Sequence, residues 1–180
     1  MKKMNEPKEK ILDLLWKTEA PVNLKEVAQK TGLKTRAANM HLLRLTKSGH
    51  ILKSKDGLYT ITDVGKEAIG LPKIDQKTAR RILSKTPPEK AFQFYSGIDQ
   101  PTGISSDNLI DLCEKVKTLN IKPVEFHTAR GDFELWVSSL GDIELAKKLR
   151  LIRETGLTGD LLRERLHKVL KSRCDELLKK

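Results

Sequence analysis

The sequence predicts an α+β protein of two domains. Apolar residues follow a helical period over most of its 180 residues, whereas shorter stretches in each half alternate as strands do. A Gly-Leu-Pro sequence at 70–72 breaks the chain, and a basic segment follows it. We therefore expect an N-terminal domain over residues 1–70, a basic linker over 71–88 with a short helix at 79–83, and a mostly helical domain with a small sheet over 89–180.

In the first domain, three helices, a hairpin and a fourth helix are expected in that order. The apolar spacing places the helices at 6–18, 24–30, 35–48 and 63–69. Asn23, Thr35 and Thr62 are the expected N-caps, because their short side chains accept from free backbone amides. Asp56-Gly57 lies between two apolar runs and predicts the hairpin turn, which needs positive φ.

Motif residues lie in order along this stretch. They are Leu24-Lys25-Glu26-Val27-Ala28, Leu42, Leu45, Gly49, Ile51 and the run Tyr59-Thr60-Ile61-Thr62-Asp63-Val64-Gly65. The set resembles the winged helix-turn-helix of MarR- and ArsR-like regulators, with Ile61 where the family pattern has Leu. The resemblance implies a transcription regulator that binds double-stranded DNA, usually as a homodimer, with the third helix in the major groove.

The third helix is the candidate recognition helix. Its expected inner positions are Ala38, Leu42 and Leu45, and on or near its outer face lie Lys34, Thr35, Arg36, Asn39, Met40 and Arg44. Arg36 and Asn39 are expected to read base edges, because Arg pairs with guanine N7/O6 and Asn with adenine N6/N7.

The remaining candidates are expected to position the duplex. Thr35 and Arg44 suit phosphates, Met40 suits a thymine methyl or is merely exposed, and Lys53 and Lys55 on the hairpin suit the backbone or minor groove. The alternative for each cation is a solvated surface side chain without a partner.

The net charge of +11 fits a polyanionic partner. It does not separate DNA from RNA, so an RNA-binding or ribosome-associated protein remains an alternative, as does an adaptor whose winged helix binds protein. No apolar run approaches the ~18 residues of a membrane span, and no signal sequence is visible at the N-terminus. We expect a cytoplasmic protein that does not bind a membrane.

The second domain mixes strand and helix patterns. A strand is expected at 90–95, a helix capped by Ser105 or Ser106 and ending near Asn120, and an edge-type strand at 124–127 after Pro123. Asp132 is the expected cap of a helix at 133–140. Further helices are expected at 143–154 and from Thr158 to Leu178.

A signature runs through this half as His127…Arg130-x-Asp132-Phe133-x-x-Trp136. It is accompanied by Phe92, Phe94, Leu109, Leu112, Gly141-Asp142 and Leu145-Ala146. Together they resemble a small, mainly archaeal domain of unknown function, which often has Asn at the position of Gly131. This resemblance implies a fold family and no activity.

Two interpretations of His127, Arg130, Asp132 and Trp136 stay open. They form either a site for an anionic effector or a structural cluster, in which Asp132 caps a helix, Arg130 pairs with a carboxylate and His127 bonds a backbone carbonyl. The effector would be a small molecule or a protein, and this domain would sense it or dimerise the chain.

Catalysis is not expected. No Ser or Cys nucleophile lies beside a base, and no Gly-rich phosphate loop or metal-spaced cluster is visible. We therefore expect no enzyme, no cofactor and no metal. Cys113 and Cys174 occupy apolar helix positions and are expected to be buried thiols rather than a disulfide.

Overall fold

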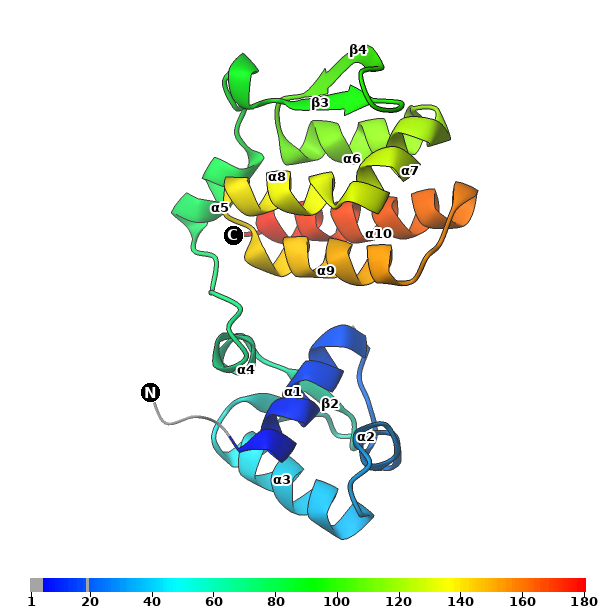
Figure 1. Cartoon of the computed structure of the whole chain (residues 1–180). Coiled ribbons are helices and arrows are strands. Elements are labelled where there is room, and N and C mark those ends of the chain that lie inside the picture. Colours follow the sequence, from blue (N-terminus) through cyan, green and yellow to red (C-terminus); the bar gives the residue numbers. More distant parts are fainter. Residues whose placement is uncertain (1–4, 19) are drawn as a thin grey trace. The chain divides into compact units, whose positions relative to one another are not determined.

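The structure is a computed structural model that describes residues 5–18 and 20–180. The chain divides into two compact units, unit 1 ending at Lys73 and unit 2 running from Ile74 to Lys180. Both mix helices with a two-stranded antiparallel sheet, which confirms the α+β class (Figure 1). None of the helices in the described residues has the length and apolar content needed to cross a bilayer.

Unit 1 consists of a helical cluster, a hairpin and a short closing helix. The elements are α1 (Glu6–Thr18), α2 (Leu24–Thr31), α3 (Thr35–Lys47), β1 (Ile51–Lys53), β2 (Tyr59–Ile61) and α4 (Asp63–Ala68). Ile11, Leu12, Val27, Leu42 and Ile51 lie in one buried cluster to which helices and hairpin both contribute. Aliphatic burial of this kind is the main stabilising contribution in so small a unit.

The N-caps of these helices are the residues predicted from the sequence, with one exception. Asn23 accepts from the amide of Glu26, and the Glu26 carboxylate accepts from the amide of Asn23, so α2 begins with a capping box. Thr62 accepts from the amide of Gly65 at the start of α4. The predicted cap of α3 is wrong: Lys34 holds the cap position, and Thr35 is the first helical residue.

The hairpin has the predicted turn. Ile51 pairs with Ile61 and Lys53 with Tyr59 in antiparallel register, and Gly57 has a φ of 77°. A further bridge joins Val22 to Tyr59, so the loop before α2 lies alongside β2. The hairpin is therefore tied to the helical cluster along both strands.

Unit 2 is a helical bundle covered by a hairpin. Its elements are α5 (Gln76–Leu83), a 3-10 turn (Pro88–Lys90), β3 (Phe92–Tyr95), β4 (Pro101–Ser106), α6 (Leu109–Thr118), α7 (Ile121–Arg130), α8 (Asp132–Leu140), α9 (Ile143–Glu154) and α10 (Gly159–Leu177). The long helix α10 packs against α5, α6, α7 and α9, and the β3–β4 hairpin lies over α6 and α7 on the other side (Figure 1).

The expected linker over 71–88 is wrong in its middle part. Residues 76–83 form α5, which Asp75 caps by accepting from the amide of Thr78. Ala79 and Ile82 are buried in the core of unit 2. The three cations of this helix, Lys77, Arg80 and Arg81, are exposed on its other faces, which is compatible with that burial.

Two strand and cap predictions in unit 2 are also wrong. Ser105 and Ser106 belong to β4, and Asn108 caps α6 by accepting from the amide of Asp111. The predicted edge strand at 124–127 is part of α7. Pro123 lies in the first turn of this helix, where a backbone N–H would have no partner within the helix, so the N–H that proline lacks is not missed. The helix expected to end near Asn120 does so, since α6 ends at Thr118, and Asn120 also caps α7 by accepting from the amide of Lys122.

A buried ion-pair network closes the bundle. Nε and Nη2 of Arg173 donate to the two carboxylate oxygens of Asp142 at 2.7 and 2.9 Å, and Nη1 donates to Glu144 at 3.2 Å. The Asp142 carboxylate also accepts from the amide of Leu145, which caps α9. Arg173 and Asp142 are almost completely buried, so the start of α9 and the end of α10 are joined away from solvent.

Candidate functional site

The third helix of unit 1, α3, has a buried side and an exposed side, and each holds the residues that the apolar spacing predicts. Ala38, Leu42 and Leu45 are fully buried. Every expected outer residue is exposed: Lys34, Thr35, Arg36, Asn39, Met40 and Arg44. His41 is buried beside Leu42, and among the described residues its Nδ1 has no hydrogen-bond partner. One side of α3 is therefore sealed, and the opposite side is available.

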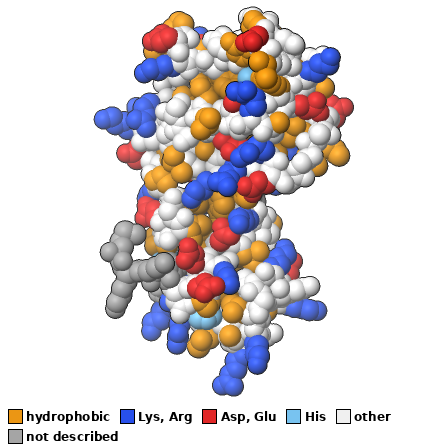
Figure 2. Space-filling view, in the orientation of Figure 1, with side chains coloured by type: hydrophobic (Ala, Val, Ile, Leu, Met, Phe, Trp, Pro, Cys, Tyr) orange, Lys and Arg blue, Asp and Glu red, His pale blue; other side chains and the backbone are white. Residues whose placement is uncertain are grey.

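Positive charge is concentrated around this free side. From Val27 to Lys55 the chain has seven Lys and Arg and no Asp or Glu. Within the described part of the chain, Lys34, Arg36 and Arg44 have no ion pair. Figure 2 shows Lys and Arg side chains gathered at the lower edge of unit 1, where α3 lies, and acidic side chains higher on the same face. This side of unit 1 carries an uncompensated positive field.

The hairpin lysines extend the same charge. Lys53 and Lys55 are both exposed, one at the end of β1 and one in the turn. Nζ of Lys53 lies 5.6 Å from the ring centroid of Tyr59, a cation–π contact that restricts where this ammonium group points. Lys55 has no such contact among the described residues and is free to adapt.

Backbone contacts fix α3 and the hairpin to each other. The amide of His50 donates to the carbonyl of Leu45 in the last turn of α3. Thr62 donates from its hydroxyl to the carbonyl of Gly49 at 2.7 Å and from its amide to the carbonyl of His50 at 3.0 Å. The end of α3 and both ends of the hairpin therefore meet at one small set of hydrogen bonds.

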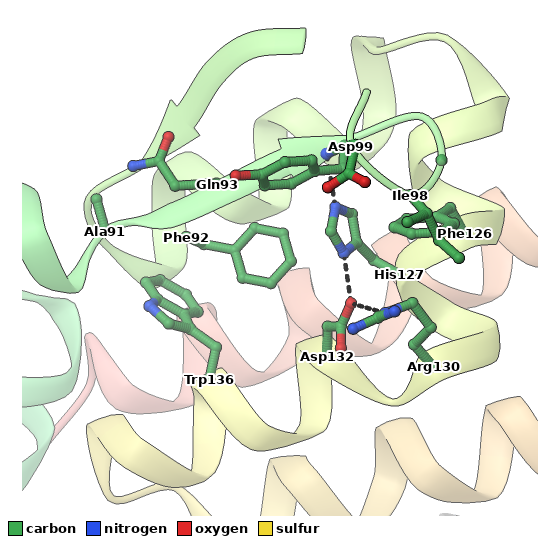
Figure 3. Close-up of a pocket in the computed structure, with 12 residues that line it drawn as sticks. Ala91, Phe92, Gln93, Ile98, Asp99, Phe126, His127, Arg130, Asp132 and Trp136 are labelled. Atoms are coloured by element: carbon green, nitrogen blue, oxygen red, sulfur yellow. Dashed lines mark hydrogen bonds and ion pairs between the residues drawn. The ribbon is translucent and has the colours of Figure 1, made fainter. Parts of the chain in front are cut away.

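In unit 2, the structure brings His127, Arg130 and Asp132 together at the junction of α7 and α8 (Figure 3). One carboxylate oxygen of Asp132 lies 2.7 Å from Nδ1 of His127 and accepts from Nε of Arg130 at 3.0 Å. Gly131, in left-handed conformation at φ 75°, makes the turn that allows these neighbours to face one another.

His127 is held between two partners. The amide of Tyr95 donates to its Nε2 at 2.8 Å, so that nitrogen carries no proton, and Nδ1 must donate to Asp132. Burial lowers the pKa of His127, and this effect outweighs the hydrogen bond and charge of Asp132, which raise the pKa. The imidazole is therefore neutral with both nitrogens occupied, and in this arrangement it cannot act as a general base.

The structural interpretation of this cluster is thus partly wrong in its details. Gly131 holds the cap position of α8, and the Asp132 side chain turns back toward His127 instead of capping the helix. His127 accepts from a backbone N–H, where a bond to a backbone carbonyl was expected. The expected pairing of Arg130 with a nearby carboxylate is present, with Asp132 as the partner.

A cavity of about 470 Å³ opens beside the cluster. Four aromatic residues line it, Phe92, Tyr95, Phe126 and Trp136, together with the polar side chains of Gln93, Asp99, Arg130 and Asp132. The Trp136 indole N–H donates to the carbonyl of Lys90 at 2.8 Å, so Trp136 is a buried core residue and a wall of the cavity at once. The volume suits a small organic molecule.

Most of these lining residues are not assigned to a site by the sequence. Gln93, Tyr95 and Asp99 come from the β3–β4 hairpin, and Phe126 comes from α7, which was expected to be a strand. The spacing of Phe126 and Arg130 is the one local signal, because residues four apart on a helix are neighbours. The Arg130 guanidinium lies 5.2 Å from the Phe126 ring centroid.

The two cysteines are buried free thiols, as expected. A hydrogen bond from Cys174 lowers the pKa of the Cys113 thiol, whereas the same contact and burial raise the pKa of Cys174. Ligand atoms of Cys113, Glu114 and His167 lie within 4.8 Å of one another, a geometry in which a metal ion would have three ligands. Cys113 is buried, Glu114 is exposed and His167 is half-buried.

No protein-family model matches the chain, and comparisons with curated proteins and with solved structures found no match.

Proposed function

We propose that the protein is a DNA-binding transcription regulator whose unit 1 acts as a winged helix-turn-helix, with α3 in the major groove and the hairpin on the backbone. The observation that carries the proposal is the division of α3. Its aliphatic residues are sealed in the core, while Arg36 and Asn39 stand exposed beside unpaired cations. A helix enters a major groove only in this arrangement.

The proposed roles follow from the side chains. Arg36 and Asn39, at the start of α3, contact base edges, and Met40 contacts a thymine methyl. Lys34, Thr35 and Arg44 hold phosphates, as do Lys53 and Lys55 on the hairpin. A homodimer would place two copies of α3 about 34 Å apart on one side of a duplex, and sedimentation at micromolar concentration tests the dimer directly.

The salt dependence of binding tests the DNA proposal. We expect affinity for duplex fragments to fall steeply with salt, and each lost phosphate contact to reduce the log–log slope by ~0.9. Lys55→Ala should reduce this slope, whereas Arg36→Ala should mainly reduce sequence preference. Arg150→Ala, which removes an exposed cation of α9 paired with Glu154, is the matched control. A flat salt dependence would contradict the proposal.

The duplex itself must also be identified. Selection of bound fragments from genomic DNA yields the operator, and competition with structured RNA at matched salt tests the RNA-binding alternative. Stronger competition by RNA than by duplex DNA would move the assignment to an RNA-binding protein.

A second candidate function is protein binding by the same face. Met40 and Leu43 are 42% and 54% exposed on α3, and adjacent exposed apolar residues are a feature of protein contacts. If unit 1 is an adaptor, a variant with Arg36→Ala and Lys53→Ala retains its protein partner. Under the DNA proposal the same variant loses nucleic-acid binding, and Leu43→Ala has a small effect.

A further inference from the structure

The cavity of unit 2 contains polar atoms that its own structure leaves unused. Within the described residues, the Arg130 guanidinium makes one hydrogen bond, from Nε, and its two terminal nitrogens have no partner. The second carboxylate oxygen of Asp132 accepts no hydrogen bond there either. Arg130 therefore retains the pair of N–H groups with which a guanidinium binds a carboxylate in bidentate fashion.

Asp99 places an opposite charge at the same cavity. It lies in the turn between β3 and β4, where the amide of Gln100 donates to the carbonyl of Gly97 at 3.2 Å. In the described chain it has no ion pair, and it is the one non-glycine residue with positive φ, at 56°. Figure 3 shows its carboxylate pointing toward the space above His127. Backbone held in this region is found disproportionately at ligand sites.

Aromatic side chains form the walls of the cavity beside these charges. Phe92 stacks on Phe133 with ring centroids 5.0 Å apart and meets Trp136 edge-on at 5.7 Å, so this wall is part of the core and is rigid. Phe126 supports the Arg130 guanidinium from the other side. Asp132, which is itself bonded to His127, holds Arg130 at Nε, and among the described residues the terminal nitrogens have no hydrogen-bond partner.

We propose that this cavity binds a free α-amino acid. The carboxylate of the ligand lies on the terminal nitrogens of Arg130, its ammonium group on the Asp99 carboxylate, and its side chain against Phe92 and Trp136. A cavity that presents one cationic and one anionic group beside apolar walls complements a zwitterion with an aliphatic or aromatic portion.

The charge balance ranks the ligands. Asp99 and Asp132 are acidic and Arg130 is basic, so the cavity is negative by one charge in a chain of net charge +11. Nucleotides and inorganic phosphate are disfavoured by the two carboxylates. Basic amino acids should bind most tightly, neutral ones next and acidic ones least. The expectation of a purely anionic effector is replaced by this one. The proposal does not depend on nucleic-acid binding by unit 1.

The test uses Trp136 as its reporter. The chain has two tryptophans, so a Trp16→Phe background leaves Trp136 as the only one. The twenty amino acids are titrated singly against the full-length protein, following Trp136 emission and, independently, the unfolding temperature. Each ligand that binds is compared with its decarboxylated amine and its deaminated acid, which should both bind at least tenfold more weakly.

Two variants separate the ends of the ligand. Asp99→Asn removes the charge while Asn tolerates the positive φ, and Arg130→Gln removes the guanidinium. Each should weaken amino-acid binding by about tenfold or more, since a hydrogen bond to a charged group contributes on that order. Asp99→Asn should no longer discriminate against the deaminated acid, and Arg130→Gln no longer against the decarboxylated amine.

Matched controls are Asp160→Asn and Arg150→Gln, exposed charges that do not line the cavity. Circular dichroism confirms that each variant is folded. The proposal is overturned if no amino acid changes either signal up to ~10 mM, a concentration at which even a millimolar ligand is bound. It is also overturned if Asp99→Asn and Arg130→Gln bind like the controls, or if phosphate or nucleotides compete better than any amino acid.

Discussion

The backbone amide of Tyr95 donates a 2.8 Å hydrogen bond to Nε2 of His127, joining residues 32 positions apart. The contact sets the tautomer of the imidazole, because Nε2 must use its lone pair to accept from the amide and therefore carries no hydrogen. It also connects the β3–β4 hairpin to α7. A proton on Nε2 would break this bond, so the hairpin is linked to the protonation of one side chain.

The stability of unit 2 should therefore depend on pH. Burial lowers the pKa of folded His127 below its usual value near 6.5, so below that pH the unfolded chain binds more protons than the folded one. The free energy of unfolding should be constant above about pH 7 and decrease as the pH falls below 6.5. Urea denaturation at pH 7.5, 6.5 and 5.5 measures this. His127→Gln should flatten the decrease, and an unchanged slope in that variant would refute the assignment.

Arg173 should be among the most costly residues to truncate. Arg173→Met leaves the buried carboxylate of Asp142 without its cation and removes one of the cations paired with Glu144, which costs about 3–5 kcal/mol. Arg150→Met breaks an exposed pair and should cost about 0.3–0.5 kcal/mol. Urea midpoints of the two variants and the wild type give the comparison, and equal losses would mean that the buried network contributes no more than a surface pair.

Gly65 should not tolerate a side chain. A Cβ at this position would collide with the carbonyl oxygen of His50 and with the Ile61 side chain. Gly65→Ala should destabilise unit 1 by about 1–3 kcal/mol, the range for overpacking, whereas Val64→Ala, next to it and exposed, should have little effect. Thermal unfolding of both variants tests this prediction. Identical melting temperatures would show that the backbone around Gly65 can shift to make room for the methyl group.

The capping box of α2 should be measurable by itself. Asn23→Ala removes the acceptor of the Glu26 amide and should cost about 1 kcal/mol. Asn23→Asp retains an acceptor and should be nearly neutral. Denaturant unfolding of the two variants checks this, and a loss as large in Asn23→Asp as in Asn23→Ala would assign the effect to something other than the cap.

Unit 1 was predictable from sequence because its signals are local. The spacing of Leu42 and Leu45, the cap at Asn23 and the turn at Gly57 each act within a few residues. Their order gave the arrangement of helices and hairpin. Only the cap of α3 was misplaced, by one residue, because Thr35 is a good cap by type but lies inside the first turn.

Unit 2 was less predictable because long-range contacts decide its elements. β4 has few apolar residues and is a strand because it pairs with β3. Residues 121–127 alternate like a strand, yet Val124 and His127 are both buried on one side of a helix. The signature located His127, Arg130 and Asp132, but Asp99 and Tyr95 join them only through the folded hairpin.

The hydrogen bonds of Thr62 to Gly49 and His50 have a consequence for the proposed complex with DNA. Together with the bond from the His50 amide to the Leu45 carbonyl, they hold the base of the hairpin against the last turn of α3. The backbones that carry Arg36 and Lys55 therefore move as one body on a duplex, even though the Lys55 side chain itself is free to adapt. A DNA sequence whose groove fits α3 but whose phosphates lie out of reach of the hairpin could not satisfy the contacts of the helix and those of the hairpin at the same time. Operator choice would then respond to DNA shape as well as to base identity.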